Sequence, residues 1–246
     1  WDQKQTHLSL RTHLLEETYE ALDALDKEDT EGMAEEFGDL LLQIVLHAQI
    51  ASEAGEFRMA DIIQGIHRKI VRRHPHVFGD VQVSGEAGVL TNWEKLKAAE
   101  REGNGKKDKK GLLDGVPLSL PALTQAQEIQ DRAARVGFDW PAIDGVLEKV
   151  IEEVGEIRAA RTPQELADEI GDLLFAVVNV ARWQKVDAES ALRATSSRFR
   201  KRFGYIEAKA AERGKAVTEL TFEQMDELWE EAKKNLEEGA PTPPTD

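Results

Sequence analysis

The chain has 246 residues and a formal net charge of −15, from 47 acidic and 32 basic residues, and such a surface repels nucleic acid. The chain has no cysteine, which excludes disulfides and thiolate zinc sites and agrees with a cytoplasmic location. The longest apolar run, LLFAVVNVA, is far shorter than the about 20 residues that span a bilayer, so we expect no membrane segment.

The first half begins with two amphipathic segments that carry carboxylates in a fixed pattern. Apolar residues recur at three- and four-residue spacing here and along nearly the whole chain, which predicts an all-α fold. The segment LLEETYEAL has the form Glu-Glu-x-x-Glu, and EEFGDLLLQIVLHAQ contains Glu-x-x-Asp. The acidic residues are Glu16, Glu17, Glu20, Glu36 and Asp39.

A glycine- and lysine-rich segment, residues 101–118, separates the halves of the sequence, and we expect it to be a linker. A further helix is predicted from about residue 120 to residue 136. The first half has no counterpart to this helix, so we expect a first helix to be missing there because the chain is truncated.

The second half repeats the carboxylate pattern in the same order. VIEEVGEI supplies Glu152, Glu153 and Glu156, and DEIGDLLFAVVNVAR supplies Glu169 and Asp172. This duplication predicts two tandem helical-bundle domains, residues 1–100 and 119–238, and a disordered tail at 239–246.

Helix boundaries are well marked in the second half. Thr162 to Glu165 is a capping box with proline at the first helical position, and Thr221 with Gln224 predicts another. Asp187 marks the start of a helix for which Gly214 is the expected C-cap.

Residues three or four apart share a helix face, so each acidic segment presents paired carboxylates. Two such helices packed antiparallel bring four carboxylates together, and they repel each other unless a cation lies among them. Mg²⁺ suits oxygen ligands of this kind. A solvated surface is the alternative explanation, but it must account for the same order appearing twice beside apolar runs. A di-iron site requires Glu-x-x-His, which neither copy has, and His47 is expected to be a core residue.

Basic residues follow each acidic pair in matched positions. Lys69 and Arg73 in the first half correspond to Arg198 and Arg202 in the second, and such side chains stabilise phosphoryl charge. A solvated basic face is the alternative. Trp93 with Lys97, and Trp229 with Lys233, could supply a base-stacking ring and a phosphate contact, although tryptophan on an amphipathic helix commonly packs in a core.

One position distinguishes the repeats. Asn179 lies on the same predicted helix face as Glu169 and Asp172, whereas the first repeat has Leu46 there. A buried amide needs hydrogen-bond partners. We therefore expect Asn179 to contact substrate, with an amide bonded to the helix backbone as the alternative.

Together these residues resemble the MazG family of nucleoside triphosphate pyrophosphohydrolases, whose signature is Glu-Glu-x-x-Glu, a spacer and Glu-x-x-Asp. The resemblance also covers WDQKQTH, KIVRRHPHVFGD, GVPLSLPAL and RAARVGFDW, and so nearly the whole chain. It implies tandem all-α domains that pair as a homodimer and Mg²⁺-dependent hydrolysis of a nucleoside triphosphate to the monophosphate and pyrophosphate.

The resemblance also implies residue roles. Metal ligands are expected at Glu153, Glu156, Glu169 and Asp172, and by repetition at Glu17, Glu20, Glu36 and Asp39. Glu152 is expected to orient or deprotonate water, and Arg198 and Arg202 to contact phosphate as catalytic groups. Substrate contacts are expected at Asn179, Trp229 and Lys233, and in the first repeat at Lys69, Arg73, Trp93 and Lys97.

The second repeat is expected to be the main catalyst, and the chain has no Walker A loop, which excludes a P-loop ATPase. A helical dimer that binds a nucleotide or a protein partner without turnover remains an alternative. So does a hydrolase for one narrow substrate.

Overall fold

The structure, a computed structural model, describes residues 4–79, 81, 85 and 111–237. Within those residues every regular element is a helix and there is no strand, which confirms the all-α prediction. The chain divides into two compact units, Trp1–Lys109 and Lys110–Asp246, and the division falls inside the segment predicted to be a linker.

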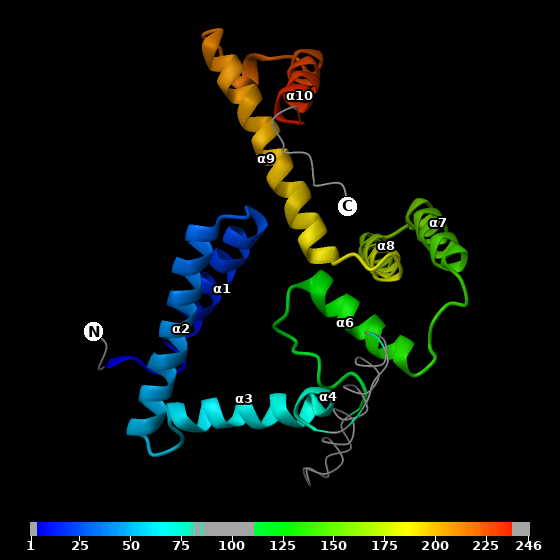
Figure 1. Ribbon diagram of the computed structural model, residues 1–246. Coiled ribbons are helices and arrows are strands. Elements are labelled where there is room, and N and C mark those ends of the chain that lie inside the picture. The colour runs from blue at the N-terminus through cyan, green and yellow to red at the C-terminus, as the bar shows by residue number, and fades with distance from the viewer. Residues whose placement is uncertain (1–3, 80, 82–84, 86–110, 238–246) are drawn as a thin grey trace. The chain divides into compact units, whose positions relative to one another are not determined.

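In the first unit, α1 (Arg11–Asp26) and α2 (Thr30–Glu53) form a hairpin and lie side by side (Figure 1). Their buried residues include several alanines, namely Ala21, Ala24, Ala48 and Ala51. Such small side chains let two helix backbones approach closely. After them come α3 (Met59–Arg73) and the short α4 (Pro75–Phe78).

In the second unit, α7 (Ile143–Ala159) and α8 (Pro163–Trp183) form the corresponding hairpin. Before it comes α6 (Ala122–Arg135), which matches the predicted helix at 120–136, and after it comes α9 (Ala188–Glu212). A short 3-10 turn (Val217–Glu219) leads into α10 (Phe222–Glu237), which packs on α9 around a core of Ile206, Ala210, Leu220 and Leu228.

The predicted helix starts are confirmed by their hydrogen bonds. Glu165 N–H donates to Thr162 Oγ1 at 3.2 Å, and Thr162 N–H donates to Glu165 Oε2 at 3.3 Å, which completes the capping box. Asp29 caps α2 in the first unit by accepting a bond from Gly32 N–H at 3.1 Å. These caps therefore set where α2 and α8 begin.

Two further caps agree with the sequence. Asp187 accepts a bond from Ser190 N–H at 2.7 Å at the start of α9, and Thr221 with Gln224 closes the start of α10. Gly214, just beyond α9, has a φ of 65°, a left-handed conformation that favours glycine.

Polar side chains of α6 fasten the neighbouring helices. Gln130 donates to the carbonyl of Phe175 in α8 at 2.8 Å. Gln127 donates to the carbonyl of Val186, between α8 and α9, and accepts a bond from the N–H of Ala188, the first residue of α9. Arg132, nearly buried, donates to the carbonyls of Leu112 and Gly115. Part of the segment predicted as a linker therefore packs against α6, while residues 101–110 and the tail at 239–246 lie outside the described residues.

Each hairpin leaves an apolar stripe exposed on its second helix. In α8 the stripe consists of Leu166, Ile170, Leu174 and Val177, which are 41–54% exposed. In α2 the stripe consists of Phe37, Leu41 and Ile44, at the positions that match Ile170, Leu174 and Val177. Within the described residues, each hairpin taken by itself therefore has exposed apolar surface in the same place.

Among the described residues, no helix is both long enough and apolar enough to cross a bilayer.

Candidate metal centre

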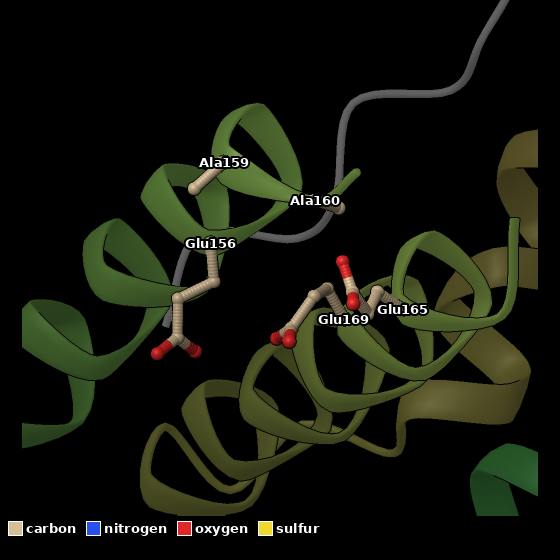
Figure 2. Close-up of a pocket in the computed structure, with 5 residues that line it drawn as sticks. All are labelled: Glu156, Ala159, Ala160, Glu165 and Glu169. Atoms are coloured by element: carbon tan, nitrogen blue, oxygen red, sulfur yellow. The ribbon is translucent and has the colours of Figure 1, made fainter. Parts of the chain in front are cut away.

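Three carboxylates of the second repeat converge between α7 and α8. Glu153 and Glu156 come from α7 and Glu169 from α8, and each offers an oxygen that lies within 4.8 Å of the other two. Figure 2 shows Glu156 and Glu169 extending from their two helices with their carboxylates in the gap between them. A pocket beside them is lined by Glu156, Ala159, Ala160, Glu165 and Glu169.

These three carboxylates differ in their surroundings. Glu153 is 2% exposed, Glu169 is half-buried and Glu156 is exposed. The pKa of Glu156 is raised above its usual range, first by close contact with the Glu153 carboxyl, then by burial and by the charge of Glu169. Ionised carboxylates this close together repel each other, and a bound cation would offset that repulsion.

Glu153 is the most constrained member. Its Oε1 is 2.7 Å from Nζ of Lys149, which lies one turn earlier on α7. Its Oε2 is buried and has no hydrogen-bond partner within the described part of the chain. Lys149 also lies 2.9 Å from Oε1 of Glu152, and these two contacts raise the Lys149 pKa. The sequence analysis overlooked Lys149, although its spacing of three and four residues from the acidic pair was visible.

The first repeat forms a similar cluster. Oxygens of Glu17, Glu20 and Glu36 lie within 4.8 Å of one another, with the first two on α1 and the third on α2. Burial and the charges of Asp39, Glu20 and Glu16 raise the pKa of Glu17. Burial and the charge of Glu20, followed by those of other neighbouring carboxylates, raise the pKa of Glu36. Each cluster therefore contains three of the four predicted ligands.

The two aspartates lie outside these groups of three. Asp39 is close enough to Glu17 to raise its pKa but does not join the cluster within 4.8 Å. Asp172 is exposed on α8, one turn after Glu169, and does not belong to the group of three either. Their role as ligands stays a prediction.

Two of the predicted phosphate and base contacts of the second repeat, Arg202 and Trp229, lie together where α10 packs on α9. The guanidinium carbon of Arg202 lies 5.5 Å from the centre of the Trp229 ring, and Phe199 packs on the same ring at 5.1 Å. Arg198 donates to Thr195 Oγ1 at 2.8 Å, and Lys233 Nζ lies 2.5 Å from Glu230 Oε1. In Figure 1, α10 packs near the end of α9 that is remote from α8.

In the first repeat, Lys69 and Arg73 both lie on α3, one turn apart. Trp93 and Lys97, the predicted counterparts of Trp229 and Lys233, lie outside the described residues.

Asn179 belongs to a polar network that the sequence did not reveal. Arg182 Nε donates to Asn179 Oδ1 at 2.9 Å, and Arg182 also bonds Asp139 Oδ1 at 2.5 Å. Trp183 donates to the same Asp139 oxygen at 3.1 Å. Because arginine has no acceptor, the amide oxygen must face it and the Nδ2 donor is turned elsewhere.

His47 pairs with His7, with their Nδ1 atoms 2.7 Å apart and their rings stacked. Burial, followed by the charge of His7, lowers the pKa of His47. His47 is therefore a partly buried residue of the first unit and is not in its carboxylate cluster.

The donor sets of both clusters suit a hard divalent cation. All three ligands in each are carboxylates, which Mg²⁺ and Mn²⁺ prefer over softer donors. The buried, unpartnered Oε2 of Glu153 is a second indication, because a buried carboxylate oxygen without a partner is costly. The residues present therefore fit a metal ion.

Comparison with known proteins gives one family. The model of the MazG nucleotide pyrophosphohydrolase domain matches twice, at residues 5–78 and 143–205. These ranges contain both carboxylate clusters.

Individual relatives are similar along most of this chain. A nucleoside triphosphate pyrophosphohydrolase/pyrophosphatase MazG of Thermotoga maritima is 46% identical over 95% of this chain and 88% of its own. A nucleoside triphosphate pyrophosphohydrolase of Escherichia coli is 43% identical over 95% of this chain and 90% of its own. The uncharacterized protein YabN of Bacillus subtilis is 50% identical over 95% of this chain, which spans 48% of YabN.

Proposed function

Because this chain belongs to the MazG family of nucleotide pyrophosphohydrolases, we propose that it hydrolyses nucleoside triphosphates to nucleoside monophosphates and pyrophosphate, with Mg²⁺ as its cofactor. The observation that carries the proposal is the carboxylate cluster of Glu153, Glu156 and Glu169, which includes a buried oxygen without a partner. Removal of damaged or unwanted nucleotides from the cellular pool, in the cytoplasm, is the role that we assign to this reaction.

In the second repeat, Glu153, Glu156, Glu169 and Asp172 would hold the metal ion. When bound, such an ion neutralises phosphate charge and activates or positions the attacking water. Asp172 is exposed on α8 one turn after Glu169, and we propose it as the fourth ligand on that position alone. The first repeat would use Glu17, Glu20, Glu36 and Asp39 in the same way.

The other residues would handle the proton and the developing negative charge. Glu152, exposed and next to the buried ligand Glu153, would orient the water and take its proton as the water attacks the α-phosphorus. Arg198 and Arg202 would stabilise the departing pyrophosphate. Lys69 and Arg73 would take the corresponding place in the first repeat.

The substrate's base and sugar would be recognised by the groups at α10 and α8. The Trp229 ring, packed against Arg202, would stack on the base, and Lys233 would contact phosphate. Asn179 would present its Nδ2 donor to a sugar or base oxygen, because Arg182 occupies its Oδ1. Trp93 and Lys97 are the proposed counterparts in the first repeat.

We further propose that the active form is a homodimer. The exposed apolar stripes on α8 and α2 support this, since burial of such surface drives association. A dimer would also offer a way to bring the α9–α10 end of one chain to the carboxylates of its partner. Size-exclusion chromatography with light scattering measures the mass directly, and a monomer at micromolar concentration would contradict this part of the proposal.

The reaction is tested by separate detection of pyrophosphate and orthophosphate across a panel of nucleoside triphosphates. We expect monophosphate and pyrophosphate, with activity lost in EDTA and restored by Mg²⁺. Diphosphate with orthophosphate as main products would refute the reaction. Tight nucleotide binding without turnover would identify a binding module instead, and turnover of a single triphosphate would identify a narrow-specificity enzyme.

A further inference from the structure

Lys149 holds both members of the acidic pair in the second repeat. It lies on α7, three residues before Glu152 and four before Glu153, so all three side chains share one helix face. Its Nζ is 2.9 Å from Glu152 Oε1 and 2.7 Å from Glu153 Oε1. One ammonium group therefore contacts the proposed water-orienting base and the proposed buried ligand at the same time.

The two oxygens of Glu153 have different surroundings as a result. Oε1 is paired with Lys149, whereas the buried Oε2 has no donor among the described residues. A carboxylate that is 2% exposed loses its hydration, and an ion pair to one oxygen compensates only part of that cost. The unpaired oxygen, Oε2, is on Glu153, which lies beside Glu156 and Glu169 in the cluster.

The first repeat has a different group at this position. His13 stands four residues before Glu17, as Lys149 stands four before Glu153, and its Nδ1 lies 3.2 Å from Glu16 Oε2. Glu17 is less buried than Glu153. Glu153, the more deeply buried glutamate, is therefore paired with the ammonium group of Lys149, whereas Glu17 has the imidazole of His13 nearby.

We propose that Lys149 is a positioning residue of the metal centre, which holds Oε1 of Glu153 so that Oε2 is presented to the ion between Glu156 and Glu169. This inference rests on the proposed function of the cluster as a metal site. Through its second contact, Lys149 also keeps Glu152 beside the site. Outer partners that orient ligands in this way commonly contribute roughly 10–100-fold to metal affinity.

The test measures metal binding by the full chain, with Mn²⁺ as the probe and isothermal titration calorimetry as the method. All proteins carry Glu17→Gln and Glu20→Gln, which disable the first cluster so that binding reports on the second. In this background we expect Lys149→Met, which keeps the length of the side chain but not its charge, to weaken Mn²⁺ binding by roughly 10–100-fold. Lys149→Arg can bridge the same two carboxylates and should stay within about threefold of the parent.

Lys209→Met is the matched control. Lys209 forms a comparable pair with Glu212 on α9, at 2.7 Å, and neither residue belongs to the carboxylate cluster. Its Mn²⁺ affinity should equal that of the parent. If Lys149→Met does not give a native helical signal, Lys149→Gln replaces it, with the same expected loss.

The outcomes separate this inference from the proposed function. If Lys149→Met binds Mn²⁺ as tightly as the parent, the positioning role is overturned. If it binds Mn²⁺ more tightly, the ammonium competes with the ion, and the positioning role is overturned too. Glu153→Gln in the same background should abolish binding. If Glu153→Gln binds as well as the parent, the cluster is not the metal site, and the proposed function fails together with the inference.

Discussion

Replacement of Glu169 by glutamine should stabilise the protein without metal and destabilise it relative to wild type with metal. Glu169 and the buried Glu153 offer oxygens within 4.8 Å of each other. Two like charges at that separation repel by about 1 kcal/mol at the dielectric of water and by more at an effective dielectric of 20. Because Glu169 is only half-buried and water screens its charge, we use the repulsion of about 1 kcal/mol. Glutamine removes this repulsion while nearly preserving the size of the side chain.

The metal reverses the order of stability. At a Mg²⁺ concentration of 100 times Kd, a single site stabilises the native state by about 2.7 kcal/mol. Wild type gains this amount at the second repeat, whereas Glu169→Gln has lost a ligand and gains much less. The contribution from the first repeat is the same in both proteins and cancels in the comparison.

The assay is thermal unfolding followed by circular dichroism, in EDTA and in Mg²⁺. In EDTA, Glu169→Gln should melt about 2–4 °C above wild type, and in Mg²⁺ it should melt below wild type. The matched control is Asp168→Asn on the same helix, whose carboxylate accepts a bond from Gln164 and lies outside the cluster. A Glu169→Gln protein that melts below wild type in EDTA refutes the repulsion, and an equal Mg²⁺ shift in both proteins refutes the site.

Three further predictions concern the two repeats and the network around Asn179. Asp172→Ala should lower the rate of pyrophosphate release far more than Asp39→Ala, because we assign most turnover to the second repeat; a larger loss in Asp39→Ala contradicts this division. Asn179→Leu, which copies Leu46, should change the ratio of kcat/KM between triphosphates by an amount equivalent to about 0.5–1.5 kcal/mol, the value of one neutral hydrogen bond; an unchanged ratio across the panel removes Asn179 from substrate recognition. Burial opposes ionisation of Asp139, but bonds from Arg182, Trp183 and the backbone N–H of Trp140 hold its pKa below the usual range. A lowered folded-state pKa adds stability above the unfolded-state pKa, about 3.9, and this stability disappears as the pH falls through the folded-state pKa. Asp139→Asn should therefore lower the free energy of unfolding by about 1–2 kcal/mol at neutral pH and by progressively less below about pH 4, as measured by urea unfolding across pH; a difference that does not depend on pH contradicts the assignment.

The sequence predicted the helices and the paired carboxylates on a single helix because both depend on short-range spacing. Glu17 and Glu20 must share a face of any helix that contains them, and Thr162 with Glu165 identifies a helix start without reference to other elements. Both predictions follow from positions three residues apart.

Features that depend on contacts between distant segments were not predictable in the same way. The partner of Asn179 is Arg182, only three residues away, but its orientation depends on Asp139, 43 residues from Arg182. The burial of Glu153 compared with Glu156 likewise depends on how α7 packs on α8. Lys149 satisfies the same helical spacing, but it precedes the acidic pair and has His13 at the matching position of the first repeat, whereas the predicted basic contacts follow the acids in both repeats.

The helix caps described above also determine which changes in chain length this fold tolerates. Asp29 stands seven residues before Glu36, and Thr162 stands seven residues before Glu169, so in both repeats the cap lies close to two turns from the carboxylate. The two repeats differ in spacer length, since Glu20 to Glu36 spans three more residues than Glu156 to Glu169.

The three additional residues of the first repeat lie at the end of its first helix. The α1 helix continues six residues past Glu20, to Asp26, whereas α7 continues three past Glu156, to Ala159. Three residues make just under one helical turn, so the first helix of the hairpin is longer in the first repeat than in the second. The glutamate on the second helix stays seven residues after its cap in both repeats. Insertions before the cap are therefore the natural place for length variation among such hairpins. One residue inserted between Thr162 and Glu169 would instead rotate the carboxylate by about 100° around its helix.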